Sequence, residues 1–185
     1  MFSVMAANLA AITDMWGLGI CRILLFLHCH INWFITMLQI GDKAPDLLGV
    51  DEGGNEIRVS DYAGRKLVVY FYPKDSTPGC TAEACSFRDG MDELVAAGYS
   101  VVGVSADSVA SHGRFKEKQS LNFPLVADVD KTTIMAFGAW GEKKMAGRAY
   151  MGIIRSTFVL DGNGVVERVI AKVDTKNAAK QILLG

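Results

Sequence analysis

Residues 67–80 decide the fold of the chain, and they read LVVYFYPKDSTPGC. The run from Leu67 to Tyr72 is apolar and rich in β-prone types, which is typical of a strand buried on both faces of a sheet. Pro73 ends this strand, because proline has no backbone N–H to donate to a neighbouring strand. Apolar residues at helical spacing follow, and they predict a helix over residues 80–97 with Gly98 as its stop.

Predicted strands and helices alternate through the rest of the chain. Strands are expected over residues 56–59, 67–72, 99–105, 123–127, 156–160 and 165–170, and helices over residues 80–97, 107–119, 130–137 and 176–184. Asp107 is the expected N-terminal cap of the second helix. The sequence DGNG at residues 161–164 is a strong hairpin signal between the last two strands. This order of elements predicts a mixed α/β sheet with helices on both faces.

Residues 1–36 differ from the rest of the chain in composition. The chain has 185 residues and a net charge of -1, yet this apolar stretch holds two charged side chains, Asp14 and Arg22. We interpret it as an N-terminal extension with a wrongly assigned start, Met37 being the true first residue. A membrane anchor and a targeting segment are the alternatives. Residues 37–185 then form one domain of ordinary size and charge.

Several classes of ligand are not expected. A net charge near zero does not indicate binding to a nucleic acid, which requires an excess of positive charge. The triplet His28-Cys29-His30 does not predict a metal site, because adjacent side chains point away from one another and no second cluster completes the set. We therefore expect no metal at this triplet.

The loop between the buried strand and the first helix carries the candidate chemistry, because α/β folds bind ligands outside the carboxyl ends of strands. Cys80 is expected in the first helical turn, where unpaired N–H groups and the helix dipole favour a thiolate, the nucleophilic form of cysteine. Thr77 offers a hydroxyl to a small polar substrate beside the sulfur. Pro73 and Pro78 stiffen the loop, and Gly79 allows a close backbone approach.

Cys85 follows Cys80 by five residues. On an undistorted helix this spacing corresponds to about 7.5 Å of rise and about 140° of rotation, so the Cα atoms lie roughly 8–9 Å apart. A disulfide needs Cα atoms within about 7 Å. If the two cysteines form a redox pair, the first turn of the helix must unwind in each cycle. The alternative is that Cys85 is a small buried apolar residue.

The same residues carry a resemblance to a known family. The spacing PxxxTxxC at residues 73–80 matches the peroxiredoxin active-site motif, and FYPKxxTPGCTxxAC at residues 71–85 is similar to the bacterioferritin-comigratory-protein, or peroxiredoxin Q, branch. The likeness continues through FRD at 87–89, GVSxD at 103–107, FGxWGEK at 137–143 and YMGIIRxTF at 150–158. It extends from about Gln39 to the C-terminus and leaves residues 1–36 without a counterpart.

The resemblance implies a thioredoxin-like fold without a metal, haem, flavin or other cofactor. It also implies a thiol-dependent peroxidase that reduces hydrogen peroxide and organic hydroperoxides. Cys80 would be the peroxidatic residue, which becomes a sulfenic acid, and Cys85 the resolving residue, which condenses with it to a disulfide. Thr77 would hydrogen-bond the peroxide, and Arg155 would be the active-site arginine that stabilises the thiolate. Thioredoxin is the implied reductant, acting by thiol exchange.

The sequence is also compatible with two other functions. A non-catalytic peroxide sensor would use the same cysteines without turnover. A cysteine hydrolase needs a histidine base, and the one histidine outside residues 1–36 is His112, which no feature places beside Cys80. We expect a cytoplasmic protein, because a cysteine pair at a helix start in a reducing compartment suits a catalytic disulfide. The resemblance implies a monomer. Membrane attachment is expected only if residues 1–36 are retained.

Overall fold

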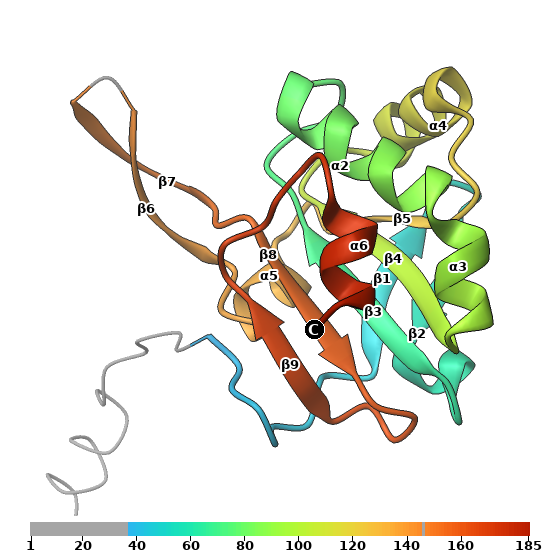
Figure 1. The fold of residues 1–185 in the computed structure, drawn as a ribbon. Helices are drawn as coiled ribbons and strands as arrows, with labels where there is room; N and C mark the ends of the chain where they lie inside the picture. The colour runs from blue at the N-terminus through green and yellow to red at the C-terminus, as the bar shows by residue number, and fades with distance from the viewer. Residues whose placement is uncertain (1–36, 146) are drawn as a thin grey trace, which may run out of the picture. The chain divides into compact units, whose positions relative to one another are not determined.

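The computed structural model describes residues 37–145 and 147–185. The interpretations of residues 1–36, including the His28-Cys29-His30 triplet, lie outside the described residues. In the described part, a seven-stranded sheet has the order β2-β1-β5-β4-β3-β8-β9, and β6 and β7 form a separate two-stranded sheet (Figure 1).

The strands are β1 (Leu47–Asp51), β2 (Glu56–Arg58), β3 (Lys66–Phe71), β4 (Tyr99–Ser105), β5 (Leu125–Ala127), β6 (Trp140–Met145), β7 (Arg148–Ile153), β8 (Ser156–Leu160) and β9 (Val166–Ile170). The helices are the 3-10 helix η1 (Val59–Tyr62), α2 (Pro78–Asp89), α3 (Met91–Ala96), α4 (Val109–Gln119), α5 (Thr132–Ala136) and α6 (Ala178–Leu183). Strand β3 pairs parallel with β4 and antiparallel with β8, which confirms the predicted mixed sheet.

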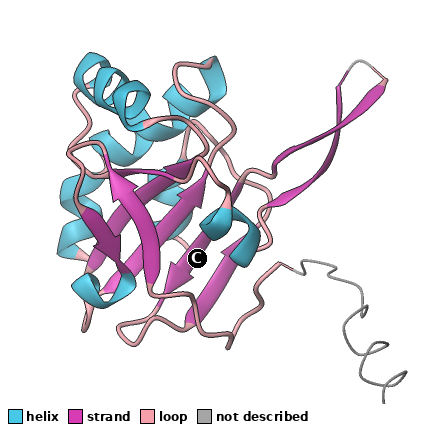
Figure 2. Ribbon diagram, turned by 180° about the vertical axis from the view of Figure 1, so that it is seen from behind, coloured by secondary structure: helices cyan, strands magenta, loops and turns pink. Residues whose placement is uncertain are grey.

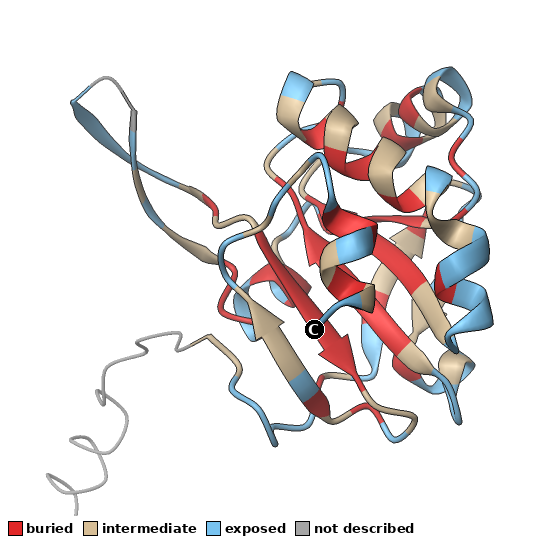
Figure 3. Cartoon of the chain, viewed as in Figure 1, coloured by how far each residue is buried: buried red, intermediate tan, exposed pale blue. Residues whose placement is uncertain are grey.

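Strand β3 separates two hydrophobic cores. Leu67, Val69 and Phe71 pack on one face with residues of α5 and η1. The alternate residues Val68 and Tyr70 pack on the other face with α2, α3, α4 and α6. All five residues are buried, as a strand covered on both faces requires. Figure 3 shows the central strands of the sheet mostly in the colour of buried residues. Helices therefore lie on both faces of the sheet, as predicted (Figure 2).

The helix predicted over residues 80–97 is in fact two helices. α2 ends at Asp89 and α3 begins at Met91, with Gly90 between them. A Cβ at Gly90 would lie 2.5 Å from the Cβ of Ala179 in α6, so only glycine allows this close packing. The prediction of one continuous helix was wrong because the break depends on a contact with the far end of the chain.

The N-terminal cap of α4 also differs from the prediction. Ser108 occupies this position, and its side chain accepts a hydrogen bond from the backbone N–H of Ser111. Asp107 lies one residue earlier and accepts instead from the backbone N–H of Asp75 and the hydroxyl of Ser105. Asp107 thus joins the loop after β3 to the end of β4.

The hairpin of β6 and β7 was not predicted. Its strands pair from Trp140 with Ile153 to Met145 with Arg148, and the hairpin extends away from the seven-stranded sheet in Figure 1. Tyr150 is exposed although it is large and apolar. Because the strands cover no core along most of their length, their sequence lacks the clear alternation that marks a half-buried strand. Within residues 37–145 and 147–185, every helix is too short or too polar to span a bilayer.

Candidate active site

The strand register brings the loop after β3 and Arg155 to the same edge of the sheet. β3 ends at Phe71, and the loop leads from there into α2. Ser156 opens β8 and pairs with Phe71 in the antiparallel register. Arg155 directly precedes Ser156, so it lies beside the loop although it is 75 residues from Cys80 in sequence.

Cys80 and Arg155 form the central contact of the site. Cys80 is the third residue of α2 and is 1% exposed. The guanidinium of Arg155 donates through Nη2 to the sulfur of Cys80 at 3.2 Å. A Cβ added at Gly79 would lie 3.5 Å from the same Nη2, so the guanidinium rests against the first turn of the helix. Its fixed positive charge stabilises a thiolate at this position.

Glu83 completes this cluster, and the sequence analysis missed it. It lies three residues after Cys80, is 0% exposed, and its Oε2 accepts from Nη1 of Arg155. Burial raises the pKa of Glu83 to about 7, although the attraction and hydrogen bond of Arg155 act in the opposite direction. Residues three apart share a face of a helix, and this spacing was the available signal.

Arg155 therefore interacts with two acidic groups at once. One guanidinium nitrogen faces the sulfur of Cys80 and another faces the carboxylate of Glu83. Desolvation lowers the pKa of Arg155, but both partners raise it, and the net direction is upward. Arg155 stays charged and is held in one orientation by Glu83.

Thr77 is the N-terminal cap residue of α2, but its side chain makes no capping hydrogen bond. Its hydroxyl donates instead to the carbonyl of Lys74 at 3.0 Å. The hydroxyl oxygen can still accept a hydrogen bond from another donor. The backbone N–H groups of Gly79 and Cys80 have no backbone acceptor outside the helix in the described part of the chain. Such N–H groups at a helix start are suited to a negatively charged oxygen.

The other predicted loop residues lie at the two ends of this segment. Pro73 directly follows Tyr72, which is buried, and is itself half-buried. Pro78 is exposed and occupies the first helical position of α2, where its missing N–H costs nothing.

Cys85 lies in the middle of α2 and is half-buried. Its sulfur lies 3.7 Å from Oε1 of Gln119, at the last residue of α4. Both Cys80 and Cys85 are free thiols, and both lie in one continuous helix, for which helical geometry places Cα atoms five residues apart beyond the reach of a disulfide. They cannot bond without a local opening of α2.

His112 is placed away from this cluster. It is 0% exposed in α4, and its ring nitrogens contact the carboxylate of Asp75 and the carbonyl of Val126. Both nitrogens are thus occupied, and His112 is not available as a base for Cys80. This arrangement argues against a cysteine hydrolase.

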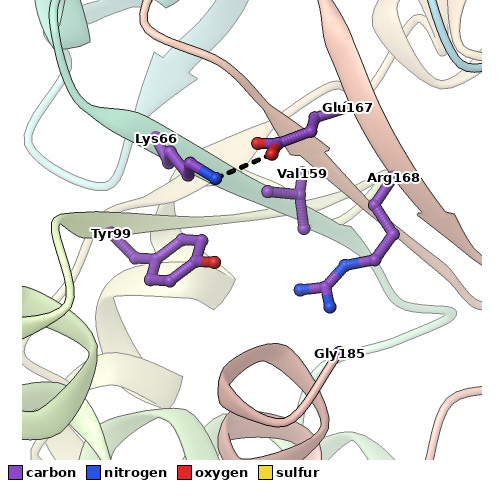
Figure 4. A pocket seen from close by; sticks show the side chains of 6 residues that line it. All are labelled: Lys66, Tyr99, Val159, Glu167, Arg168 and Gly185. Atoms are coloured by element: carbon purple, nitrogen blue, oxygen red, sulfur yellow. Dashed lines mark hydrogen bonds and ion pairs between the residues drawn. The ribbon is translucent and has the colours of Figure 1, made fainter.

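A surface hollow of about 170 Å³ lies at the opposite end of β3 from the cysteines (Figure 4). Its lining residues are Lys66, Tyr99, Val159, Glu167, Arg168 and Gly185. Lys66 and Glu167 form an ion pair at 2.7 Å across it. None of the predicted site residues lines this hollow. In residues 37–145 and 147–185 no cluster of three or more His, Cys, Asp or Glu is arranged to bind a metal.

A reduced cysteine in the first turn of a helix, paired with an arginine at the edge of a mixed sheet, defines a thiol-based redox protein. The comparison with solved structures supports a thioredoxin-like fold of the peroxiredoxin type. Peroxiredoxin Q of Xanthomonas campestris, in a Cys-to-Ser mutant, is 43% identical with a TM-score of 0.69 over 76% of this chain and 88% of that chain. A PrxQ mutant of Xylella fastidiosa is 35% identical, with a TM-score of 0.74, and the match covers 80% of this chain and 95% of that chain.

Sequence comparisons give the same family. The AhpC/TSA family model matches residues 40–169. Peroxiredoxin Bcp of Escherichia coli strain K12 is 44% identical over 140 residues, which cover 76% of this chain and 90% of the relative. Peroxiredoxin Bcp of Bacillus subtilis strain 168 is 44% identical over 146 residues, with coverage of 79% and 93%. The chain belongs to the AhpC/TSA family, in its Bcp and peroxiredoxin Q branch.

Membership in this branch makes the protein a thiol peroxidase, an oxidoreductase. Its substrate class is the hydroperoxides, and its reductant is a thiol.

Proposed function

We propose that the protein reduces hydrogen peroxide and organic hydroperoxides through Cys80, with Cys85 as the resolving residue and thioredoxin as the reductant. The observation that carries this proposal is the 3.2 Å hydrogen bond from Arg155 to the sulfur of Cys80 in the first turn of α2. A relative of known structure from Xanthomonas campestris, 39% identical, is described as having alkyl peroxide reduction activity, which supports organic hydroperoxides as substrates.

In the first step, the thiolate of Cys80 attacks the terminal oxygen of the hydroperoxide. The O–O bond breaks, the leaving oxygen takes a proton to become water or an alcohol, and Cys80 becomes a sulfenic acid. Negative charge moves from sulfur to the leaving oxygen during this step. Arg155 stabilises the charge at both positions, and the hydroxyl of Thr77 and the N–H groups of the first turn orient the peroxide.

In the second step, the thiol of Cys85 attacks the sulfur of the Cys80 sulfenic acid. A disulfide forms and the hydroxyl leaves as water. The dithiol of thioredoxin then exchanges with this disulfide, which restores both thiols of the protein and oxidises thioredoxin. Because Cys80 and Cys85 are five residues apart in α2, the helix must open between the first and second steps.

We assign this activity to residues 37–185 and propose that the protein works as a cytoplasmic monomer. A catalytic disulfide that is formed and reduced in each cycle suits a reducing compartment.

A coupled assay of the full chain tests the function. Thioredoxin, its reductase and NADPH are mixed with the protein, and NADPH oxidation is followed after hydrogen peroxide or an alkyl hydroperoxide is added. We expect sustained NADPH consumption with many turnovers for each protein molecule. A single stoichiometric oxidation would instead support a peroxide sensor, and the absence of any oxidation would contradict the proposed chemistry.

A further inference from the structure

His112 is in direct contact with two hydrogen-bond acceptors. Its Nδ1 lies 3.0 Å from Oδ2 of Asp75, and its Nε2 lies 3.1 Å from the carbonyl oxygen of Val126. Tyr72 also approaches Nδ1, at 3.3 Å, but the Tyr72 hydroxyl donates its proton to Asp75 at 2.8 Å. A carboxylate and a carbonyl accept hydrogen bonds, so both ring nitrogens are placed to donate. His112 is buried and lies against Asp75 in the geometry of an ion pair.

Asp75 is held from several directions. Its carboxylate accepts from Tyr72, from the hydroxyl of Ser111 at 2.7 Å and from His112. Burial raises the pKa of Asp75, but these hydrogen bonds together outweigh burial, and the net pKa is lowered. The backbone N–H of Asp75 also donates to Asp107 at 2.8 Å. Both the side chain and the main chain of Asp75 are thus tied to the segment from Ser105 to α4.

The position of Asp75 matters because of the residues that follow it. Ser76 has a φ of 58°, in the left-handed region that a serine adopts only when its surroundings hold it there. Thr77 comes next, and α2 begins at Pro78. The direction in which the first turn leaves the loop, and with it the placement of Cys80, depends on this held conformation.

The side chain of Cys85 lacks such an anchor. Its sulfur makes one long contact to Gln119 at the C-terminal end of α4, whereas His112 in the first half of α4 pairs with the loop. The C-terminal end of α4 holds the backbone of α2 through Arg88 instead, which donates to the carbonyl of Gln119 at 2.5 Å.

We propose that the His112–Asp75 ion pair is a positioning device that fixes the loop of residues 73–77, and so Thr77 and Cys80, for the reaction with peroxide. The inference rests on the proposed function of Cys80. His112 touches no reacting atom and is a positioning residue. The pair keeps the loop in place while α2 opens toward Cys85.

The test compares full-length variants by the rate constant for oxidation of Cys80 by hydrogen peroxide, followed by rapid quenching and mass analysis. His112→Gln leaves the buried Asp75 carboxylate without its histidine partner, and we expect the rate constant to fall about tenfold or more, since small displacements of reacting groups carry such losses. Asp75→Asn/His112→Gln replaces the ion pair with a neutral hydrogen-bonded pair, and we expect recovery to within about threefold of wild type.

The matched control removes a different ion pair from the same helix. Lys116 in α4 pairs with Glu52 and does not contact the loop, so Lys116→Gln is expected to oxidise at the wild-type rate. The rate of disulfide formation from the sulfenic acid is expected to be unchanged or faster in His112→Gln. A merely structural role would slow both steps and would be made worse, not better, by the second substitution.

If His112→Gln does not fold, Asp75→Ala supplies the same test, because His112 can then lose its charge while keeping its bond to Val126. The same tenfold loss is expected, and a wild-type rate would overturn the proposal. Nitrogen-15 NMR at pH 7 gives an independent readout, with the His112 signal assigned by its loss in His112→Gln. Two protonated ring nitrogens are expected, and a neutral ring would overturn the ion pair. If wild-type Cys80 is not oxidised at all, the proposed function fails, while the NMR result still reports on the pair.

Discussion

The two cysteines of α2 lie in one helix but in different environments. Cys80 is buried in the first turn, and its sulfur accepts a hydrogen bond from the guanidinium of Arg155. Cys85 is half-buried in the middle of the helix, and its sulfur makes a long contact with the neutral amide of Gln119. A fixed positive charge that donates to the sulfur favours a nucleophilic thiolate at the first position. Arg88, whose charge also acts on Cys85, donates to the carbonyl of Gln119 rather than to the sulfur.

This difference explains why one residue type can have two roles five residues apart. The first turn is held by the cluster of Arg155 and Glu83 and by the ion pair of the preceding loop. The second half of the helix is held by apolar packing, by the hydrogen bond of Arg88 to the carbonyl of Gln119 and by that of the Ala179 N–H to Ser86. Both halves of α2 are thus anchored, and an opening that joins the two cysteines must release one of them.

The largest expected effect comes from exchanging the two cysteines for serine. Cys80→Ser removes the nucleophile, and we expect no reaction with hydrogen peroxide. Cys85→Ser leaves the first turn intact, so a sulfenic acid should still form at the wild-type rate and then accumulate because turnover stalls. Trapping with dimedone and mass analysis distinguishes the two variants. Equal loss of the first step in both would show that the two environments are not functionally different.

The next effect concerns the charge beside Cys80. Arg155→Gln removes the guanidinium from the sulfur and from the leaving oxygen, and we expect the rate constant for peroxide reduction to fall about a hundredfold. Stopped-flow measurement of that rate constant checks the value. Arg148→Gln, in the exposed hairpin, is the matched control and should react like wild type. A loss of less than about threefold in Arg155→Gln would contradict the electrostatic role of Arg155.

A third effect concerns Glu83 and pH. The folded-state pKa of about 7 lies above the ordinary value of 4.5, so the native state binds this proton more tightly than the unfolded chain. The stabilisation is fully present below about pH 4.5 and is lost as the pH rises through 7.

We therefore expect the free energy of unfolding of wild type to fall by about 3 kcal/mol relative to Glu83→Gln between pH 4 and pH 8. Urea unfolding of both proteins at several pH values measures this difference. Parallel pH profiles would mean that Glu83 is ionised throughout and that Arg155 outweighs the burial.

The smallest expected effect lies at Cys85. Gln119→Ala removes the amide from the sulfur, and we expect alkylation of Cys85 to become about twofold faster, since a contact at 3.7 Å stabilises weakly. Gln181→Ala in α6 is the control and should leave alkylation unchanged. An increase of tenfold or more would show that Cys85 is held more firmly than its contacts indicate.

The sequence was sufficient to predict the strand, loop and helix that carry Cys80, because a buried apolar run and Pro73 are local signals. It also predicted the hairpin of β8 and β9 from its glycine-rich turn. The break at Gly90 was missed because it depends on Ala179, which comes close only in the folded chain. The pairing of His112 with Asp75 joins residues 37 apart and depends on the order of β3, β4 and β5 in the sheet.

The candidate site was predicted in part for the same reason. The placement of Cys80 at a helix start followed from local spacing, but the position of Arg155 was indicated by family resemblance alone, since no local pattern shows that β8 pairs with β3. Glu83 could have been found from its helical spacing to Cys80. Its full burial could not, because a glutamate in an isolated helix is normally exposed.

The central claim is that Cys80 reacts first and that α2 then opens to bond Cys80 to Cys85. Peptide mapping of the wild-type full chain after one equivalent of hydrogen peroxide tests it most directly, because the chain contains four cysteines. Cleavage after Glu83 separates the two cysteines, so we predict a single linked peptide pair that joins Cys80 to Cys85, lighter than the two reduced peptides by the mass of two hydrogen atoms. A disulfide that joins Cys80 to any other cysteine, or Cys80 left unoxidised, would contradict the account.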